Sequence, residues 1–192
     1  MTSEVHEVKT PNDRSTTILW LAGWSMSDKI FDPMRELLPD FHHISVDYSK
    51  ADSPEEMLLL TETAAMKIIS SNELACHAKD DRDRLLICGW SLGGLLALRL
   101  AAKGYGDGIV VFATNARFTR SKEEMDLGWS IAAIRKMMIG LMQNQQDVET
   151  RFRHNLFTEA EIEAGLGSKL PFLSSWTNKG LISGLQILRS EE

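Results

Sequence analysis

The residues of this chain best suited to nucleophilic chemistry form the stretch Gly89-Trp90-Ser91-Leu92-Gly93-Gly94. An apolar run over 85–88 that is typical of a strand precedes it, and an apolar run over 95–102 that is typical of a helix follows it. A strand, a Gly-x-Ser-x-Gly turn and a helix in this order predict a nucleophile elbow, in which the serine is strained and the glycines two residues before and after it let strand and helix approach. We expect the Ser91 hydroxyl at the positive end of the helix, where developing negative charge is stabilised.

The elements that must position this turn alternate along the chain. Apolar and β-branched runs predict further strands over 16–22, 43–48 and 108–113, and segments with one apolar face predict helices over 28–38 and 53–69. Asp28 is the expected cap of the first helix, and a capping box at 53–56 opens the second. The unbroken apolar core of the strand at 109–112 is typical of a strand covered on both faces. This alternation predicts a doubly wound α/β sheet.

The pattern changes from about Arg117 onward, where amphipathic helical stretches replace the alternation. Three sets of apolar residues recur there at helical spacing: Ile131, Ile134, Met137, Met138 and Leu141; Phe152, Leu156, Ile162 and Leu166; and Leu181, Ile182, Leu185 and Leu188. We expect residues 1–116 to form the core that carries the elbow and residues 117–192 to form a helical lid region that folds with the core as a single unit. The methionines of the lid either shape a pocket for an acyl chain or serve packing alone.

Composition argues against several classes of partner. A net charge of -6 over 192 residues disfavours nucleic acid, because phosphate binding needs clustered positive charge. No apolar run approaches the roughly 18 residues of a membrane span, and no targeting segment is evident, so we expect no membrane partner. The two cysteines, Cys76 and Cys88, fit reduced thiols in the cytoplasm. Zinc-ligand spacing is lacking, and we expect neither a metal nor a cofactor.

A family resemblance rests on Leu21-Ala22-Gly23-Trp24-Ser25-Met26, on Phe31-Asp32 and on residues 89–95. These motifs resemble the α/β-hydrolases of biotin synthesis, the pimeloyl-[acyl-carrier protein] methyl ester esterases, and the tail at 184–189 is similar to the end of that family's lid. The resemblance implies the α/β-hydrolase fold, a mainly parallel sheet with helices on both faces and a helical lid. It also implies a serine carboxylesterase that acts on a small-molecule or acyl carrier protein-linked ester.

The same resemblance assigns roles to particular residues. Ser91 is the nucleophile, and the backbone N–H groups of Trp24 and Leu92 form the oxyanion hole that holds the tetrahedral intermediate. Gly89 and Gly93 are the elbow glycines, as the motif requires. The side chains of Trp24 and Trp90 are the expected substrate-binding groups.

The chain departs from the family pattern in three places. Ala22 stands where most relatives have a histidine, and residues 48–50 replace a Pro-Gly turn. In this fold the catalytic acid and histidine follow the nucleophile on loops after later strands, but lid-like helices occupy the chain after Ser91, so the last strands are lacking. His154 is the sole histidine after the elbow; we expect it on an exposed helix face, with no catalytic role.

Three functional hypotheses therefore stay open. The chain is an ester hydrolase whose acid and histidine lie elsewhere, a non-catalytic acyl- or partner-binding module, or a fragment that another polypeptide completes. Arg135, Lys136, Arg151 and Arg153 either contact an acidic carrier protein or form a solvated face. We further expect self-association through the strand at 108–113, because a sheet edge presents unpaired hydrogen-bonding groups. Acyl-chain length and the choice between carrier protein and coenzyme A stay open as well.

Overall fold

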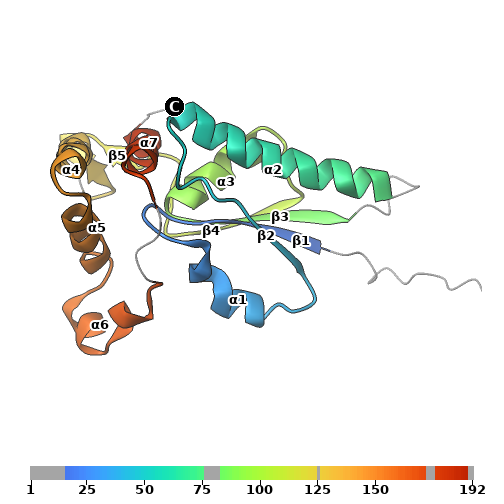
Figure 1. Cartoon of the computed structure of the whole chain (residues 1–192), viewed down its shortest axis with the longest axis horizontal. Coiled ribbons are helices and arrows are strands. Elements are labelled where there is room, and N and C mark those ends of the chain that lie inside the picture. Colours follow the sequence, from blue (N-terminus) through green and yellow to red (C-terminus); the bar gives the residue numbers. More distant parts are fainter. Residues whose placement is uncertain (1–15, 76–82, 125, 172–175, 190–192) are drawn as a thin grey trace, which may run out of the picture.

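The computed structural model of the chain describes residues 16–75, 83–124, 126–171 and 176–189. A parallel sheet of four strands lies at its centre, in the spatial order β2-β1-β3-β4 (Figure 1). The strands are β1 (Thr16–Leu21), β2 (His42–Ser45), β3 (Arg84–Trp90) and β4 (Gly108–Phe112). The chain places β2 on one side of β1 and β3 on the other, so the topological switch point lies between β1 and β3, where α/β sheets bind their ligands.

Helices cover both faces of this sheet (Figure 1). The short helix α1 (Asp32–Glu36) follows the 3-10 turn η1 (Asp28–Phe31) on one face. Helices α2 (Pro54–Ala75) and α3 (Leu92–Ala102) lie on the other face. The expected doubly wound α/β arrangement is therefore confirmed.

Local hydrogen bonds begin these helices. The Ser53 hydroxyl accepts from the N–H of Glu56 at 3.1 Å, as expected at the start of α2. The expected cap at Asp28 was wrong, because the Ser27 hydroxyl accepts from the N–H of Lys29 at 3.2 Å and caps η1. A serine one residue earlier reaches the free N–H groups with the required extended backbone.

Alternation along β1 builds a core on both faces of the sheet. Ile18 and Trp20 face α1, and the Trp20 ring lies 4.7 Å from the Phe31 ring. Leu19 and Leu21 belong to the larger cluster formed with α2, α3 and the lid helices. The strand is thus buried on both sides, as its apolar run predicts.

Strand β4 is the exception to this burial. Within the described residues it pairs only with β3, and it forms one edge of the sheet. Three of its apolar side chains are exposed: Ile109 by 38%, Val110 by 42% and Phe112 by 37%. The expectation that helices or strands cover both faces of this strand was therefore wrong, because no described element packs over its outer side.

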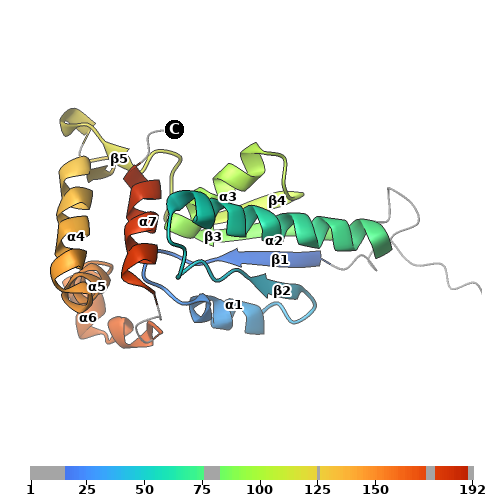
Figure 2. The ribbon, with the colours of Figure 1, turned by 45° about the horizontal axis from the view of Figure 1, so that its top comes forward.

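The lid region follows β4 and lies beyond the carboxyl ends of the strands (Figures 1 and 2). It contains the strands β5 (Thr119–Arg120) and β6 (Trp129–Ser130), the helices α4 (Ile131–Gln143), α5 (Gln145–His154), α6 (Glu159–Glu163) and α7 (Asn178–Arg189), and the 3-10 turns η3 (Lys122–Glu124) and η4 (Leu166–Lys169). Helix α7 lies between α4 and the core (Figure 2) and contacts α2, α3 and α4. The described helices include none long and apolar enough to cross a membrane.

Two of the three predicted helical patterns match single helices. Ile134 and Leu141 are buried on α4, and Leu181, Leu185 and Leu188 are buried on α7. The third, looser set divides over α5, α6 and η4, with Leu156 in the turn between α5 and α6. Thr158 caps α6 with a capping box and starts a new helix at that point.

Candidate active site

Ser91 occupies a sharp turn between β3 and α3. Its backbone has φ 54° and ψ −116°, a conformation that non-glycine residues adopt only when the surrounding structure enforces it. The N–H of Ser91 donates to the carbonyl of Phe112 at 2.9 Å and ties the turn to the end of β4. Helix α3 begins at the next residue, so the serine lies at its N-terminal end, as the motif predicts.

The glycines around Ser91 are required by close backbone contacts. A side chain on Gly93 would collide with the carbonyl oxygen of Leu21 at the end of β1, and one on Gly89 would collide with the carbonyl oxygen of Gly93. A methyl group on Gly94 would likewise overlap the Thr114 side chain, a requirement that sequence reasoning did not single out. The turn is therefore packed against the end of β1, and the helix meets the strand at van der Waals distance.

The loop that follows β1 brings Trp24 to the same end of the sheet as Ser91. Both lie at the switch point between β1 and β3, which are paired along their whole length. Within the described part of the chain, the backbone N–H groups of Trp24 and Leu92 donate to no backbone carbonyl. They are the two N–H groups that the resemblance assigns to an oxyanion hole, and that assignment stays a prediction.

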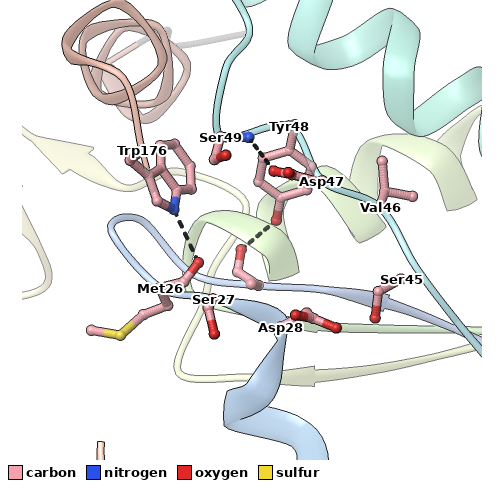
Figure 3. Close-up of a pocket in the computed structure, with 10 residues that line it drawn as sticks. Met26, Ser27, Asp28, Ser45, Val46, Asp47, Tyr48, Ser49 and Trp176 are labelled. Atoms are coloured by element: carbon pink, nitrogen blue, oxygen red, sulfur yellow. Dashed lines mark hydrogen bonds between the residues drawn. The ribbon is translucent and has the colours of Figure 1, made fainter. Parts of the chain in front are cut away.

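Contacts with the lid region hold the loop at residues 22–26, which we call the oxyanion loop after the role that the resemblance predicts for Trp24. The indole N–H of Trp24 donates to the carbonyl of Leu181 on α7 at 2.8 Å. The indole N–H of Trp176 donates to the carbonyl of Met26 at 3.0 Å (Figure 3). Ser25, which is fully buried with φ 60°, donates its hydroxyl to the carboxylate of Glu149 on α5 at 2.7 Å. The loop conformation thus depends on residues from three lid segments.

Glu149 is the one charged side chain among the buried described residues, with 3% of its surface exposed. Besides Ser25, its carboxylate accepts from the Gln145 amide at 3.0 Å. Arg153 lies nearby and donates to the carbonyls of Ser25, at 3.4 Å, and Pro171. Burial lowers the pKa of Arg153, and the negative charge of Glu149 opposes that shift. Arg153 therefore faces the oxyanion loop and is half-buried rather than fully solvated, while its contact with a carrier protein stays a prediction.

Two of the departures from the family pattern touch each other. The hydroxyl of Tyr48 donates to the carbonyl of Ala22, so a residue that replaces the Pro-Gly turn supports the oxyanion loop (Figure 3). Burial raises the pKa of Tyr48 above its ordinary value, and the charge of Asp47 adds to this. Tyr48 and Asp47 line a cavity of about 300 Å³ beside the loop, and Trp176 closes one side of this cavity (Figure 3).

The space directly at Ser91 is small and apolar. It measures about 10 Å³, room for about one water molecule, and is lined by Trp24, Ser91, Phe118, Trp129, Ile134, Met137, Phe152, Leu185 and Leu188. The Trp24 side chain is present there, as the resemblance implies. Trp90 is absent from this lining, since its ring packs on Gly23, where an added Cβ would approach to 2.9 Å. The substrate-binding role expected for Trp90 has no counterpart in this space.

A general base for Ser91 is missing from the described residues. No described side chain forms a hydrogen bond with the Ser91 hydroxyl, and His154 is exposed at the end of α5. Asp147, one of the acids that precede His154, pairs with Arg151 at 3.0 Å. His43 bridges the Trp20 indole and the Leu38 carbonyl, which is a structural role. The described residues also include no group of histidines, cysteines and carboxylates that could hold a metal ion.

The sheet order, the helices on both faces and the elbow define the α/β-hydrolase fold, and solved structures agree. The chain is similar to an esterase from Exiguobacterium antarcticum, with 17% identity, a TM-score of 0.62, and coverage of 93% of this chain and 68% of that one. An α/β-hydrolase enzyme from a Medee basin deep-sea metagenome library matches with 17% identity, a TM-score of 0.54 and coverage of 96% and 68%. The bottromycin epimerase BotH matches with 14% identity, a TM-score of 0.55 and coverage of 91% and 64%.

These likenesses establish the fold, and the chain spans about two thirds of the length of the structures it matches. The sequence matches no protein-family model and no curated protein. The α/β-hydrolase fold implied by the resemblance is therefore confirmed, while the pimeloyl-ester subfamily rests on the motifs alone. One of the matched structures is an epimerase, so the fold by itself does not select a reaction.

Proposed function

We propose that this chain carries the nucleophile and oxyanion hole of a serine ester hydrolase. One observation supports the proposal above all: Ser91 has a strained backbone at a helix N-terminus, next to two backbone N–H groups that bind no described carbonyl. Backbone strain of this kind persists only where the surrounding structure enforces it, and it clusters at active sites.

In the proposed reaction the Ser91 hydroxyl oxygen attacks the carbonyl carbon of an ester. The carbonyl oxygen becomes an anion that the N–H groups of Trp24 and Leu92 stabilise, and each such donor contributes about 2.7 to 4 kcal/mol to the transition state. The base takes the proton of the Ser91 hydroxyl and gives it to the departing alkoxide, which leaves as the alcohol; water then hydrolyses the acyl-enzyme to the free acid and restores Ser91. Both steps need a base, whose loss costs about a millionfold in turnover of a serine hydrolase. The proposal places that base outside the described residues, so the described part by itself is a slow catalyst.

We further propose an acyl ester as the substrate, with the methyl ester of pimeloyl-acyl carrier protein as the particular candidate. The motifs at 21–26 and 89–95 support this choice. Arg135, Lys136 and Arg151 are exposed on α4 and α5 and offer positive charge to an acidic carrier protein. Cys88 is a free buried thiol, which agrees with a cytoplasmic location. Copurification with acyl carrier protein, lost on charge reversal of Arg135 and Lys136, tests the partner.

A fluorophosphonate probe tests the nucleophile. The probe should label Ser91 alone, and Ser91→Ala should abolish labelling, because the elbow presents this hydroxyl to preorganised N–H donors. Ser168→Ala is the matched control, since Ser168 is exposed on η4 and its loss should leave labelling unchanged. An adduct on another serine, found by mass spectrometry, would contradict the assignment.

The second candidate function is an acyl-binding module without turnover. The lack of a base among the described residues favours it. Hydrolysis of p-nitrophenyl esters separates the two candidates. A purified chain that binds acyl ligands but neither reacts with fluorophosphonate nor hydrolyses esters is the binding module.

A further inference from the structure

A groove of about 570 Å³ runs between α4 and α5. Carbon-rich side chains form much of its wall, among them Ala133, Met137, Ile139, Val148 and Phe152. The two helices meet closely at Gly140, where an added Cβ would approach the Val148 side chain to 2.8 Å. The groove falls within the size range of small-molecule sites.

Three residues belong both to this groove and to the small space at Ser91. The shared residues are Trp129, Met137 and Phe152, and they form the wall between the groove and the space at Ser91. The Phe152 ring meets the Trp24 ring edge-on at 4.8 Å and lies 6.5 Å from the Trp129 ring. The groove is thus separated from the serine by one layer of side chains.

The two volumes decide what must happen when an ester binds. About 10 Å³ at Ser91 holds about one water molecule and no acyl group. The neighbouring groove is large, apolar and open to solvent along Ile139, which is 53% exposed. An acyl chain that lies in the groove therefore brings its carbonyl group to Ser91 only when side chains of the wall move, and Met137 is the most adaptable of them because its chain is unbranched.

We propose that the groove binds the elongated apolar chain of an ester or thioester, and that Trp129, Met137 and Phe152 form a gate through which the carbonyl group reaches Ser91. The reactive part of this inference rests on the proposed ester hydrolysis. The apolar lining favours a hydrocarbon chain. Because the gate joins the groove to the space at Ser91, the carbonyl end of the ligand lies at the gate and the hydrocarbon chain extends along the groove.

Binding to Ser91→Ala tests the groove without any need for catalysis. The fluorescent fatty acid cis-parinaric acid should bind this variant, and adding Ala133→Phe should weaken binding at least tenfold because the new ring fills the groove. Ala132→Phe is the matched control, because Ala132 is exposed on the same helix outside the groove lining, and it should leave binding unchanged. Circular dichroism verifies that each variant folds. Equal affinity of the Ala133→Phe and Ala132→Phe variants would overturn the groove assignment.

Labelling of Ser91 tests the gate. Phe152→Ala joins the groove to the serine space and should speed reaction with a long-chain alkyl fluorophosphonate at least fivefold relative to a methyl analogue. An unchanged ratio of the two rates would overturn the gate. If the parent shows no labelling and no hydrolysis but Ala133→Phe still abolishes fatty-acid binding, the ester hydrolase proposal fails while the apolar groove stands.

Discussion

The contact between Ser25 and Glu149 gives the sharpest test of how the lid region holds the oxyanion loop. Ser25→Ala removes one of the two hydrogen bonds that the buried carboxylate accepts. A hydrogen bond to a charged group contributes about 1.5 to 3 kcal/mol to stability. Because the Glu149 carboxylate stays buried after the substitution, the lost hydrogen bond is not replaced by water. We expect the free energy of unfolding to fall by about 2 to 3 kcal/mol.

Ser183→Ala is the matched control for this substitution. Ser183 is as buried as Ser25, but its hydroxyl donates to neutral carbonyls, at 2.9 Å to Lys179 and 3.3 Å to Ala51. Neutral hydrogen bonds contribute about 0.5 to 1.5 kcal/mol, so this variant should lose less stability. For a chain of this size each kcal/mol shifts the melting temperature by about 2 to 4 °C, and the difference is measurable by calorimetry.

A double-mutant cycle isolates the pair itself. Glu149→Gln keeps an acceptor for Ser25 but removes the charge, and the cycle with Ser25→Ala should show a coupling energy of at least about 1 kcal/mol. Hydrogen exchange at the Trp24 and Ser25 amides should rise in both single variants and stay unchanged in Ser183→Ala. Fluorophosphonate labelling of Ser91 should slow about a hundredfold in Ser25→Ala, because a displaced loop loses an oxyanion donor.

Two results would refute this reasoning. A coupling energy near zero would mean that the 2.7 Å contact contributes nothing in solution. Equal labelling rates in the parent and in Ser25→Ala, with a lowered melting temperature, would mean that the contact supports the fold but does not position the oxyanion loop.

Three further predictions concern the elbow, the sheet edge and alkaline pH. Gly93→Val should lower stability by about 3 kcal/mol, because its side chain collides with the end of β1; melting together with the parent would exclude the tight turn. Apolar exposure on β4 should make the chain self-associate, and Val110→Lys should yield monomers in light scattering; a monomeric parent would contradict this. Burial raises the pKa of Cys88 to about 11 and that of Tyr48 above 10.0, so the folded state keeps protons that the unfolded chain loses, and stability present below pH 9.0 should decline as the pH rises towards 11. Urea unfolding at several alkaline pH values checks this decline, which should be shallower in Cys88→Ala and Tyr48→Phe than in the parent.

The alternation of strands and helices and the strained serine turn were predictable from sequence because they depend on neighbours along the chain. Apolar spacing predicts the bounds of a helix or strand to within a few residues. The two elbow glycines are needed because any larger side chain in a βα turn of this shape would collide with nearby backbone. The capping residue of η1 was misplaced by one position because both Ser27 and Asp28 are good caps, and only the backbone angles separate them.

Contacts between distant segments lay beyond this kind of reasoning. Ser25 and Glu149 are 124 positions apart, and nothing in either local sequence indicates that a carboxylate is buried against the loop. The same holds for Tyr48 and Ala22, which separately looked like departures from a family pattern and together form a support. Likewise, nothing in the local sequence indicates that the Trp90 ring packs on Gly23 or that Arg153 donates to the carbonyl of Ser25.

The sequence by itself determined the α/β class, the position of the strained serine turn and the helical character of the lid, since each follows from periodicity or from steric limits within one turn. Only the tertiary structure decided which face of β4 lies open, how the oxyanion loop is held and where the groove beside Ser91 runs. The physical reason is that burial, hydrogen-bond partners and cavities are properties of surfaces brought together by folding. A pattern of residue types along the chain predicts which face of a helix or strand is apolar, but it does not predict which distant segment packs against that face.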